Sequence, residues 1–186
     1  MRFAKLMPAA LVLSLASAAF GQAEWAEFVD RADHFTVNMP GDPKREDLAY
    51  KTAKGTTLPA HLYSAEDRRG QYFMTVVNYQ TASDEERASA IAEASAAVRA
   101  KGKATYDAPG NLDGHNSQRI TVETPNARRR LAEILMSNDK RLYISEAETA
   151  LNAPPPAQYQ ASIQVLDDEG VRIRYQGGQV GGQRQR

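Results

Sequence analysis

Residues 57–102 read TLPAHLYSAEDRRGQYFMTVVNYQTASDEERASAIAEASAAVRAKG, and this stretch decides the fold. Residues 71–79 form a nearly continuous run of aromatic and β-branched residues, which is typical of a central strand covered on both faces. Residues 57–64 alternate apolar and polar side chains and predict a neighbouring strand. Pro59 has no backbone donor, so it predicts an edge or bulged position for that strand.

A helix over residues 83–101 follows these two strands. Ser83 and Glu86 have the spacing of a capping box, in which each side chain accepts a hydrogen bond from the other residue's backbone. Small or apolar residues then recur at helical spacing, at Ala88, Ile91, Ser95 and Val98. Gly102 is expected to end the helix as a C-cap glycine.

Working outward, alternating patterns predict five further strands, over residues 35–39, 46–51, 116–123, 130–137 and 141–147. The last three form a predicted antiparallel meander. Residues 25–33 are expected to be a lead-in. Residues 107–116 are expected to be a loop, because Pro, Gly, Asn and Asp dominate them.

The C-terminal part predicts a second helix. Three prolines precede it, and Tyr159, Ile163 and Leu166 follow at intervals of four and three. Gly170 would end this helix, and residues 171–175 alternate as a last short strand. Together these elements predict an α+β domain with a mostly antiparallel sheet of about seven strands and two packed helices.

The first residues have the pattern of a secretory signal peptide. Arg2 and Lys5 precede an apolar or small stretch over residues 6–20, and small residues then permit cleavage after Gly21 or Ala23. The apolar stretch is shorter than the roughly 20 residues that a membrane span needs. We therefore expect the chain to be exported to the periplasm or secreted.

The domain organisation expected from these patterns is a signal peptide over residues 1–23, one domain over 24–175 and a disordered Gly- and Gln-rich tail over 176–186. The chain has no cysteine, which excludes disulfides, thiolate metal sites and a cysteine nucleophile. Removal of the signal leaves 21 basic against 23 acidic residues, since two of the 23 basic ones leave with it. This balance of charge argues against a nucleic-acid partner. The sequence after the signal has no second apolar run of spanning length, so we expect no membrane span in the mature chain.

The order of elements resembles the PsbP-like α/β/α sandwich, which extrinsic photosystem subunits share with a eukaryotic nuclear-import accessory factor. The chain is also similar to small exported proteobacterial proteins of unknown function. They share an early tryptophan, here Trp25, the F-x-V-x-x-P-G-x-P segment at residues 35–43, and the strand pair at residues 57–63 and 72–79. The resemblance implies a scaffold used for non-enzymatic assembly or protein contact, and it carries over no functional residue.

No residue spacing predicts catalysis or a cofactor. His34, His61 and His115 lack the spacing that places two metal ligands on one helical turn, so we interpret them as three surface histidines with hydrogen bonds. Residues 109–120 fail as a calcium loop, because Pro and Ile occupy the first and last ligand positions. No G-x-S-x-G or S-x-x-K motif supplies a serine nucleophile.

Arginine clusters are the sharpest charge feature, at Arg68, Arg69, Arg128, Arg129 and Arg130. Arginine binds carboxylates and phosphates through paired donors, so these residues are candidates for contact with an anionic partner or anionic lipid headgroups. Each cluster lies at a predicted hairpin turn, where charge also protects a sheet from edge pairing. A solvated turn is the favoured interpretation.

Three functional hypotheses follow. The leading one is an exported, non-enzymatic domain that contacts an envelope protein. The first alternative is a small-molecule or lipid-binding protein with a pocket under the helix over residues 83–101, beside Ala88, Ala92 and Ser95. The second is a hydrolase whose site folding assembles around one of the three histidines.

Overall fold

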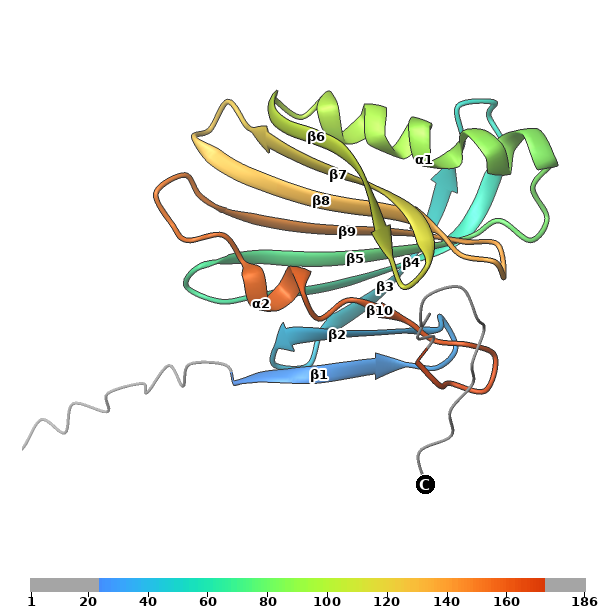
Figure 1. The fold of residues 1–186 in the computed structure, drawn as a ribbon, viewed down its shortest axis with the longest axis horizontal. Coiled ribbons are helices and arrows are strands. Elements are labelled where there is room, and N and C mark those ends of the chain that lie inside the picture. The colour runs from blue at the N-terminus through green and yellow to red at the C-terminus, as the bar shows by residue number, and fades with distance from the viewer. Residues whose placement is uncertain (1–23, 173–186) are drawn as a thin grey trace, which may run out of the picture.

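The computed structural model describes residues 24–172, which form ten strands and two helices (Figure 1). The predicted signal peptide and the predicted tail lie outside the described residues, as do residues 173–175 of the predicted last strand. Within the described part of the chain, no helix combines the length and the apolar character needed to cross a bilayer.

The elements have the following bounds: β1 Trp25–Asp30, β2 Phe35–Pro40, β3 Lys44–Lys51, β4 Thr57–Glu66, β5 Gly70–Asn78, α1 Asp84–Arg99, β6 Lys103–Leu112, β7 His115–Glu123, β8 Arg128–Met136, β9 Arg141–Ala150, α2 Ala157–Gln160 and β10 Gln164–Val165. Seven strands form one sheet in the order β3-β4-β5-β9-β8-β7-β6, and a smaller sheet has the order β1-β2-β10. Every pair is antiparallel. The α+β class with a mostly antiparallel sheet is confirmed, as is the predicted meander of β7, β8 and β9.

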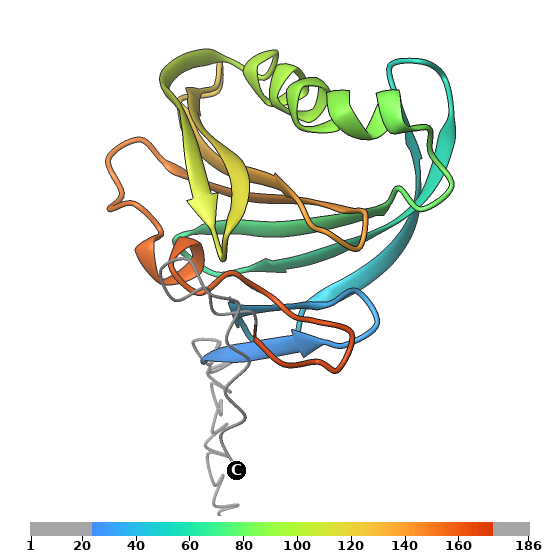
Figure 2. The same ribbon diagram turned by 45° about the vertical axis from the view of Figure 1, so that its right-hand side comes forward.

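The large sheet is curved, and α1 lies across its open side (Figure 2). Ser83 caps α1 through the predicted capping box with Glu86. The face that packs on the sheet consists of Ala90, Ala94 and Val98, which are buried among aliphatic side chains of the strands. Such small residues let the helix backbone approach the sheet closely.

The small sheet and α2 cover the opposite face of the large sheet (Figure 2). This second core is rich in aromatic residues, among them Phe35, Tyr63, Tyr72, Tyr143 and Tyr159. Strand β5 contributes to both cores, with Met74 on the small-sheet side and Val77 on the α1 side. The prediction of a central strand covered on both faces is therefore confirmed.

Pro59 corrects one prediction. Strand β4 is not at the edge, because it lies between β3 and β5. Pro59 lies in the part of β4 that pairs with β3 alone, since the pairing with β5 begins at Ala60. The missing donor is therefore tolerated on the side where no neighbour needs it.

The prediction of a loop over residues 107–116 is wrong, because most of these residues belong to the hairpin of β6 and β7. Asp113 and Gly114 form its two-residue turn, with φ values of 48° and 79°. Positive φ at both central residues defines the turn that matches the twist of a hairpin, and Asp-Gly is a strong signal for it.

The second helix is also shorter than predicted. After α2 the chain straightens, and β10 pairs with β2 through Val165 and Phe35. Ile163 and Val165 are both buried at a spacing of two, which is the period of a strand. Residues 25–33 are likewise no mere lead-in, because Trp25–Asp30 forms β1.

Gly102 is not the C-cap of α1, since Ala100 occupies that position in a right-handed conformation. A Cβ at Gly102 would lie 2.2 Å from the carbonyl oxygen of Glu123. Glycine is needed there because two backbones approach closely.

Candidate functional site

The two ends of the large sheet carry different charged groups. At one end, on the left in Figure 1, the β4–β5 turn lies next to the start of β8, because Gly70 pairs with Thr149 and Thr149 pairs with Arg129. This register brings all five sequence-predicted arginines to one end, which we call the arginine end: Arg68, Arg69, Arg128, Arg129 and Arg130.

Arg128 and Arg130 already have carboxylate partners. The Arg128 Nε lies 3.2 Å from Oε1 of Glu148. Arg130 pairs with the other oxygen of Glu148 and lies 3.3 Å from Oε1 of Glu146. Both glutamates are 9% exposed, so these ion pairs are largely shielded from solvent.

Arg129 has main-chain partners instead. Its guanidinium donates to the carbonyl oxygen of Leu151 at 2.8 Å and to that of Ala153 at 3.4 Å. Arg68 and Arg69 are exposed on the β4–β5 turn. The prediction that both clusters occupy hairpin turns is therefore wrong for Arg128–Arg130, which lie in β8 and are held within the fold.

The opposite end of the sheet contains a cleft of about 280 Å³. Four connections line it: the β1–β2 turn, the β6–β7 hairpin, the β8–β9 turn and the segment that follows β10. Its lining residues are His34, His115, Ser137, Asn138, Asp139, Val165, Leu166, Asp167 and Asp168.

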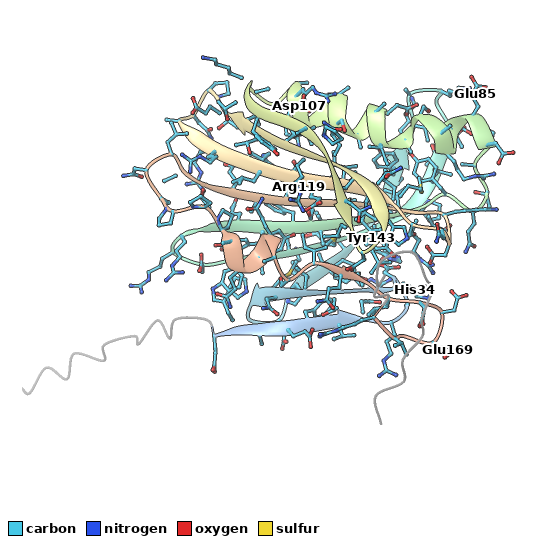
Figure 3. The ribbon with its side chains drawn as sticks, in the orientation of Figure 1. His34, Glu85, Asp107, Arg119, Tyr143 and Glu169 are labelled. Carbon is cyan, nitrogen blue, oxygen red and sulfur yellow. The ribbon has the colours of Figure 1, made fainter. Side chains whose placement is uncertain are left out.

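His34 is held firmly by its main chain. It has a φ of 55°, a left-handed conformation that a non-glycine residue seldom adopts. The Leu166 amide donates to its carbonyl oxygen at 2.8 Å. The Tyr143 hydroxyl donates to the Asp33 carbonyl at 2.9 Å and lies 3.3 Å from that of His34. Figure 3 shows Tyr143 and His34 at this end of the molecule.

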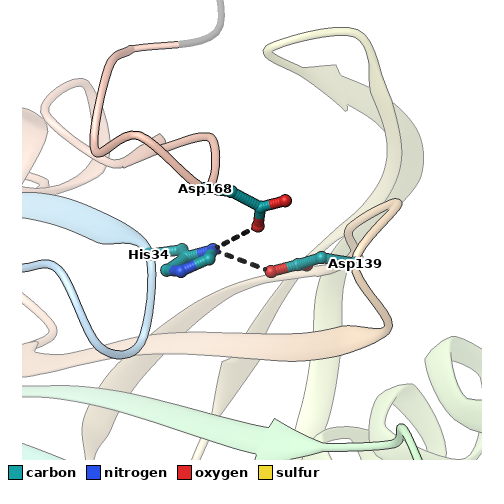
Figure 4. Close-up of side chains that lie close together, drawn as sticks. All are labelled: His34, Asp139 and Asp168. Atoms are coloured by element: carbon teal, nitrogen blue, oxygen red, sulfur yellow. Dashed lines mark ion pairs between the residues drawn. The ribbon is translucent and has the colours of Figure 1, made fainter.

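The imidazole of His34 faces two carboxylates (Figure 4). Its Nδ1 lies 2.9 Å from Oδ2 of Asp139 and 3.6 Å from Oδ1 of Asp168. Asp168 has a side chain that is 89% exposed, whereas His34 is half-buried. The three residues come from three different connections of the fold.

Asp139 is positioned by two further groups. Arg141 pairs with its Oδ2, and the Ser137 hydroxyl donates to its Oδ1. Arg141 Nη1 also lies 3.3 Å from His34 Nδ1, and its Nη2 donates to the Ala32 carbonyl at 3.1 Å. Arg141 thus joins the β1–β2 turn to the β8–β9 turn and orients the Asp139 carboxylate toward His34.

A second imidazole–carboxylate pair lies on the other side of the β1–β2 turn. His61 Nδ1 lies 2.6 Å from Oδ2 of Asp33, and the Tyr63 hydroxyl oxygen lies 2.7 Å from a carboxylate oxygen of both Asp33 and Asp30, between which it shares its proton. Burial raises the pKa of Tyr63, and its hydrogen bonds to these two carboxylates raise it further. Tyr63 therefore stays a donor and fixes the turn that carries His34.

The interpretation of three surface histidines with hydrogen bonds is wrong for His115, which is buried, whereas His34 and His61 are partly exposed and hydrogen-bonded. His115 is 4% exposed, His34 and His61 are half-buried, and two of the three line one cleft. Sequence spacing gave no indication of this, because the residues that meet in the cleft lie in separate connections. The one local signal was the Asp113-Gly114 pair, which fixes the hairpin that brings His115 to the cleft.

The prediction that Ala88, Ala92 and Ser95 line a pocket under α1 is also wrong. Ala88 and Ala92 are exposed, and the buried side of α1 is Ala90, Ala94, Ser95 and Val98. The helix packs directly on the sheet core.

Ser137 contributes a hydroxyl to the cleft lining, and this hydroxyl is already hydrogen-bonded. Its Oγ lies 3.1 Å from the Arg141 carbonyl, accepts from the Arg141 amide at 3.2 Å, and bonds to Asp139. The Asp139 carboxylate thus accepts from this hydroxyl, which ties the two side chains of the β8–β9 turn together.

No protein-family model matches this chain, and no curated protein matches it either.

Proposed function

We propose that the mature chain is an exported, non-enzymatic binding domain whose ligand occupies the cleft between the β1–β2 turn, the β8–β9 turn and the segment after β10. The single observation that carries this proposal is the convergence of His34, Asp139 and Asp168 on one cavity. Binding residues concentrate on loops that a rigid scaffold positions, and this cleft is built from four such connections.

The charge of the cleft supports a cationic ligand. Three carboxylates line it, at Asp139, Asp167 and Asp168, and Arg141 is the guanidinium that pairs with one of them. The volume of about 280 Å³ lies just below the range of about 300–1,000 Å³ that holds drug-sized molecules. A small cation fits both properties.

The resemblance to PsbP-like proteins favours binding rather than catalysis, as an analogy at the level of the fold. Export rests on the signal-peptide pattern of residues 1–23.

The second candidate function is contact with an anionic envelope partner. Arg68 and Arg69 support it, because they are exposed side by side on the β4–β5 turn. The neighbouring Arg128 and Arg130 of β8 add little, since both already form ion pairs with Glu146 or Glu148.

Thermal unfolding of the purified exported protein separates these functions. A ligand that binds only the native state raises the melting temperature. We expect divalent metal ions or small amines to raise it, and Asp168→Asn to weaken that rise. A rise with phosphate or citrate that Arg68→Ala/Arg69→Ala abolishes would favour the second candidate. Hydrolysis of a generic ester that depends on His34 would contradict a binding role.

A further inference from the structure

We propose that the cleft binds one divalent transition-metal ion, of the Zn²⁺ class, through His34 Nδ1, Asp139 Oδ2 and Asp168 Oδ1. This inference rests on the proposed function, because it names the ligand of the same cleft.

The two distances from the imidazole nitrogen to the carboxylate oxygens fit a shared ion. Metal bonds to imidazole nitrogen and carboxylate oxygen are about 2.0–2.2 Å long, which places neighbouring ligand atoms about 3.0–3.4 Å apart in octahedral or tetrahedral arrangements. His34 Nδ1 lies 2.9 Å from Asp139 and 3.6 Å from Asp168. All three ligand atoms lie within 4.8 Å of one another.

The donor set selects the class of metal. Imidazole nitrogen suits Zn²⁺ and its neighbours in the transition series, whereas Mg²⁺ and Ca²⁺ prefer sites made of oxygen alone. His34 therefore distinguishes this cluster from a group of surface carboxylates. Two protein carboxylates and one imidazole leave a coordination position for water or for a further ligand.

The surroundings combine two anchored ligands with one adaptable ligand. The turn that carries His34 is fixed by Tyr143 and Leu166, and Asp139 is fixed by Arg141. Hydrogen-bond partners of this kind orient metal ligands. Asp168 is exposed, so a small movement of its side chain could complete the coordination.

Arg141 supplies a positive charge next to the proposed metal ligands. Three lining carboxylates against one guanidinium leave a formal charge of −2, which one divalent ion would balance. Because Arg141 Nη1 lies 3.3 Å from His34 Nδ1, the ion would replace it at the imidazole. Arg141 would keep its bond to the Ala32 carbonyl.

Titration calorimetry with Zn²⁺ alone, on the purified exported protein freed of metal, tests the proposal. We expect one ion per chain, and weaker binding of Mg²⁺ and Ca²⁺. His34→Asn should weaken Zn²⁺ binding about 100-fold or more, because even the loss of an outer partner of a metal ligand costs about 10- to 100-fold. Asparagine tolerates the left-handed backbone at this position.

Asp168→Asn and Glu169→Gln form a matched pair. Both remove one negative charge from the same exposed loop, and only Asp168 faces His34. We expect the first to weaken Zn²⁺ binding at least tenfold and the second to change it less than about twofold. Circular dichroism should show both variants folded, since both side chains are exposed.

Three results would overturn the metal site: no Zn²⁺ binding, binding that His34→Asn leaves intact, or equal losses in the two loop variants. If Zn²⁺ does not bind but a small amine raises the melting temperature in a way that depends on Asp168, the proposed metal site is wrong. The cleft would then remain the proposed ligand site. If neither binds, the proposed function fails as well.

Discussion

The arginine end and the cleft lie at opposite ends of the same seven-stranded sheet, yet their charges are used differently. At the arginine end, Glu148 lies opposite Arg130 on the neighbouring strand, and both Glu146 and Glu148 form ion pairs with Arg130. At the cleft, Asp168 extends from an exposed loop toward the imidazole of His34. The lining carboxylates there outnumber the guanidinium of Arg141 that pairs with one of them.

The difference teaches that a conspicuous run of charge is weak evidence for a binding surface. Arg128–Arg130 are adjacent in the sequence and are therefore easily noticed, but strand pairing gives them partners inside the fold. The residues of the cleft stand singly in the sequence, and the ends of the strands bring them together.

Glu148→Gln should have the largest effect on stability. It removes the charge that faces both Arg128 and Arg130 in a mostly buried setting. Loss of one partner leaves the other charges uncompensated, so we expect the free energy of unfolding to fall by about 2 kcal/mol. Urea denaturation measures this change. A loss below about 0.5 kcal/mol would mean that the arginines are available to an external partner, and the contrast would weaken.

Tyr143→Phe should have a smaller effect on stability and a specific effect on the cleft. The lost hydroxyl donates to the main chain of the His34 turn, and one such bond contributes about 1 kcal/mol. We expect Zn²⁺ affinity to fall about tenfold, as for other partners that orient metal ligands. Val98→Ala, which removes core packing under α1, serves as the control and should leave Zn²⁺ affinity unchanged. An equal loss in both variants would indicate that the cleft responds only to global stability.

Glu86 makes the α1 side of the fold sensitive to acid. Hydrogen bonds from Thr56, Ser83 and Thr52 lower the pKa of Glu86 to about 2. A lowered pKa stabilises the fold above the ordinary carboxyl range, and this contribution is lost as the pH falls from about 4.5 toward 2. Glu86→Gln should therefore flatten the pH dependence of stability in this window. An unchanged profile would show that other carboxylates control acid unfolding.

Arg68→Ala/Arg69→Ala should have the smallest effect. Both side chains are exposed on the β4–β5 turn, and such substitutions usually change stability by less than about 0.5 kcal/mol. Zn²⁺ affinity should also stay the same, because the cleft lies at the other end of the sheet. Calorimetry of this variant therefore supplies the baseline for the cleft variants.

Those parts of the fold that depend on local patterns could be predicted from the sequence. The capping box at Ser83 and the apolar run of β5 each indicate one conformation by themselves. The segment around Ile163 could not be assigned this way, because Tyr159, Ile163 and Leu166 fit helical spacing, whereas the helix ends at Gln160 and the chain then continues to strand β10. Pairing of residues 164 and 165 with β2 accompanies the extended conformation there.

The cleft could not be predicted, for a physical reason. His34, Asp139 and Asp168 lie in three connections whose proximity depends on the register of both sheets. No spacing rule within the sequence encodes that register. The arginines had the opposite difficulty: their clustering was visible, whereas their partners in β9 became apparent only from strand pairing.

The most direct test of the contrast between the two ends is a titration of Co²⁺, a paramagnetic divalent ion of the same transition series, followed by NMR of the ¹⁵N-labelled exported protein. We predict that amide signals of His34, Asp139, Asp168 and their neighbours broaden first, while those of Arg68, Arg69 and residues 128–130 stay sharp. Broadening centred on the arginine end, or spread evenly over the surface acids, would contradict the account.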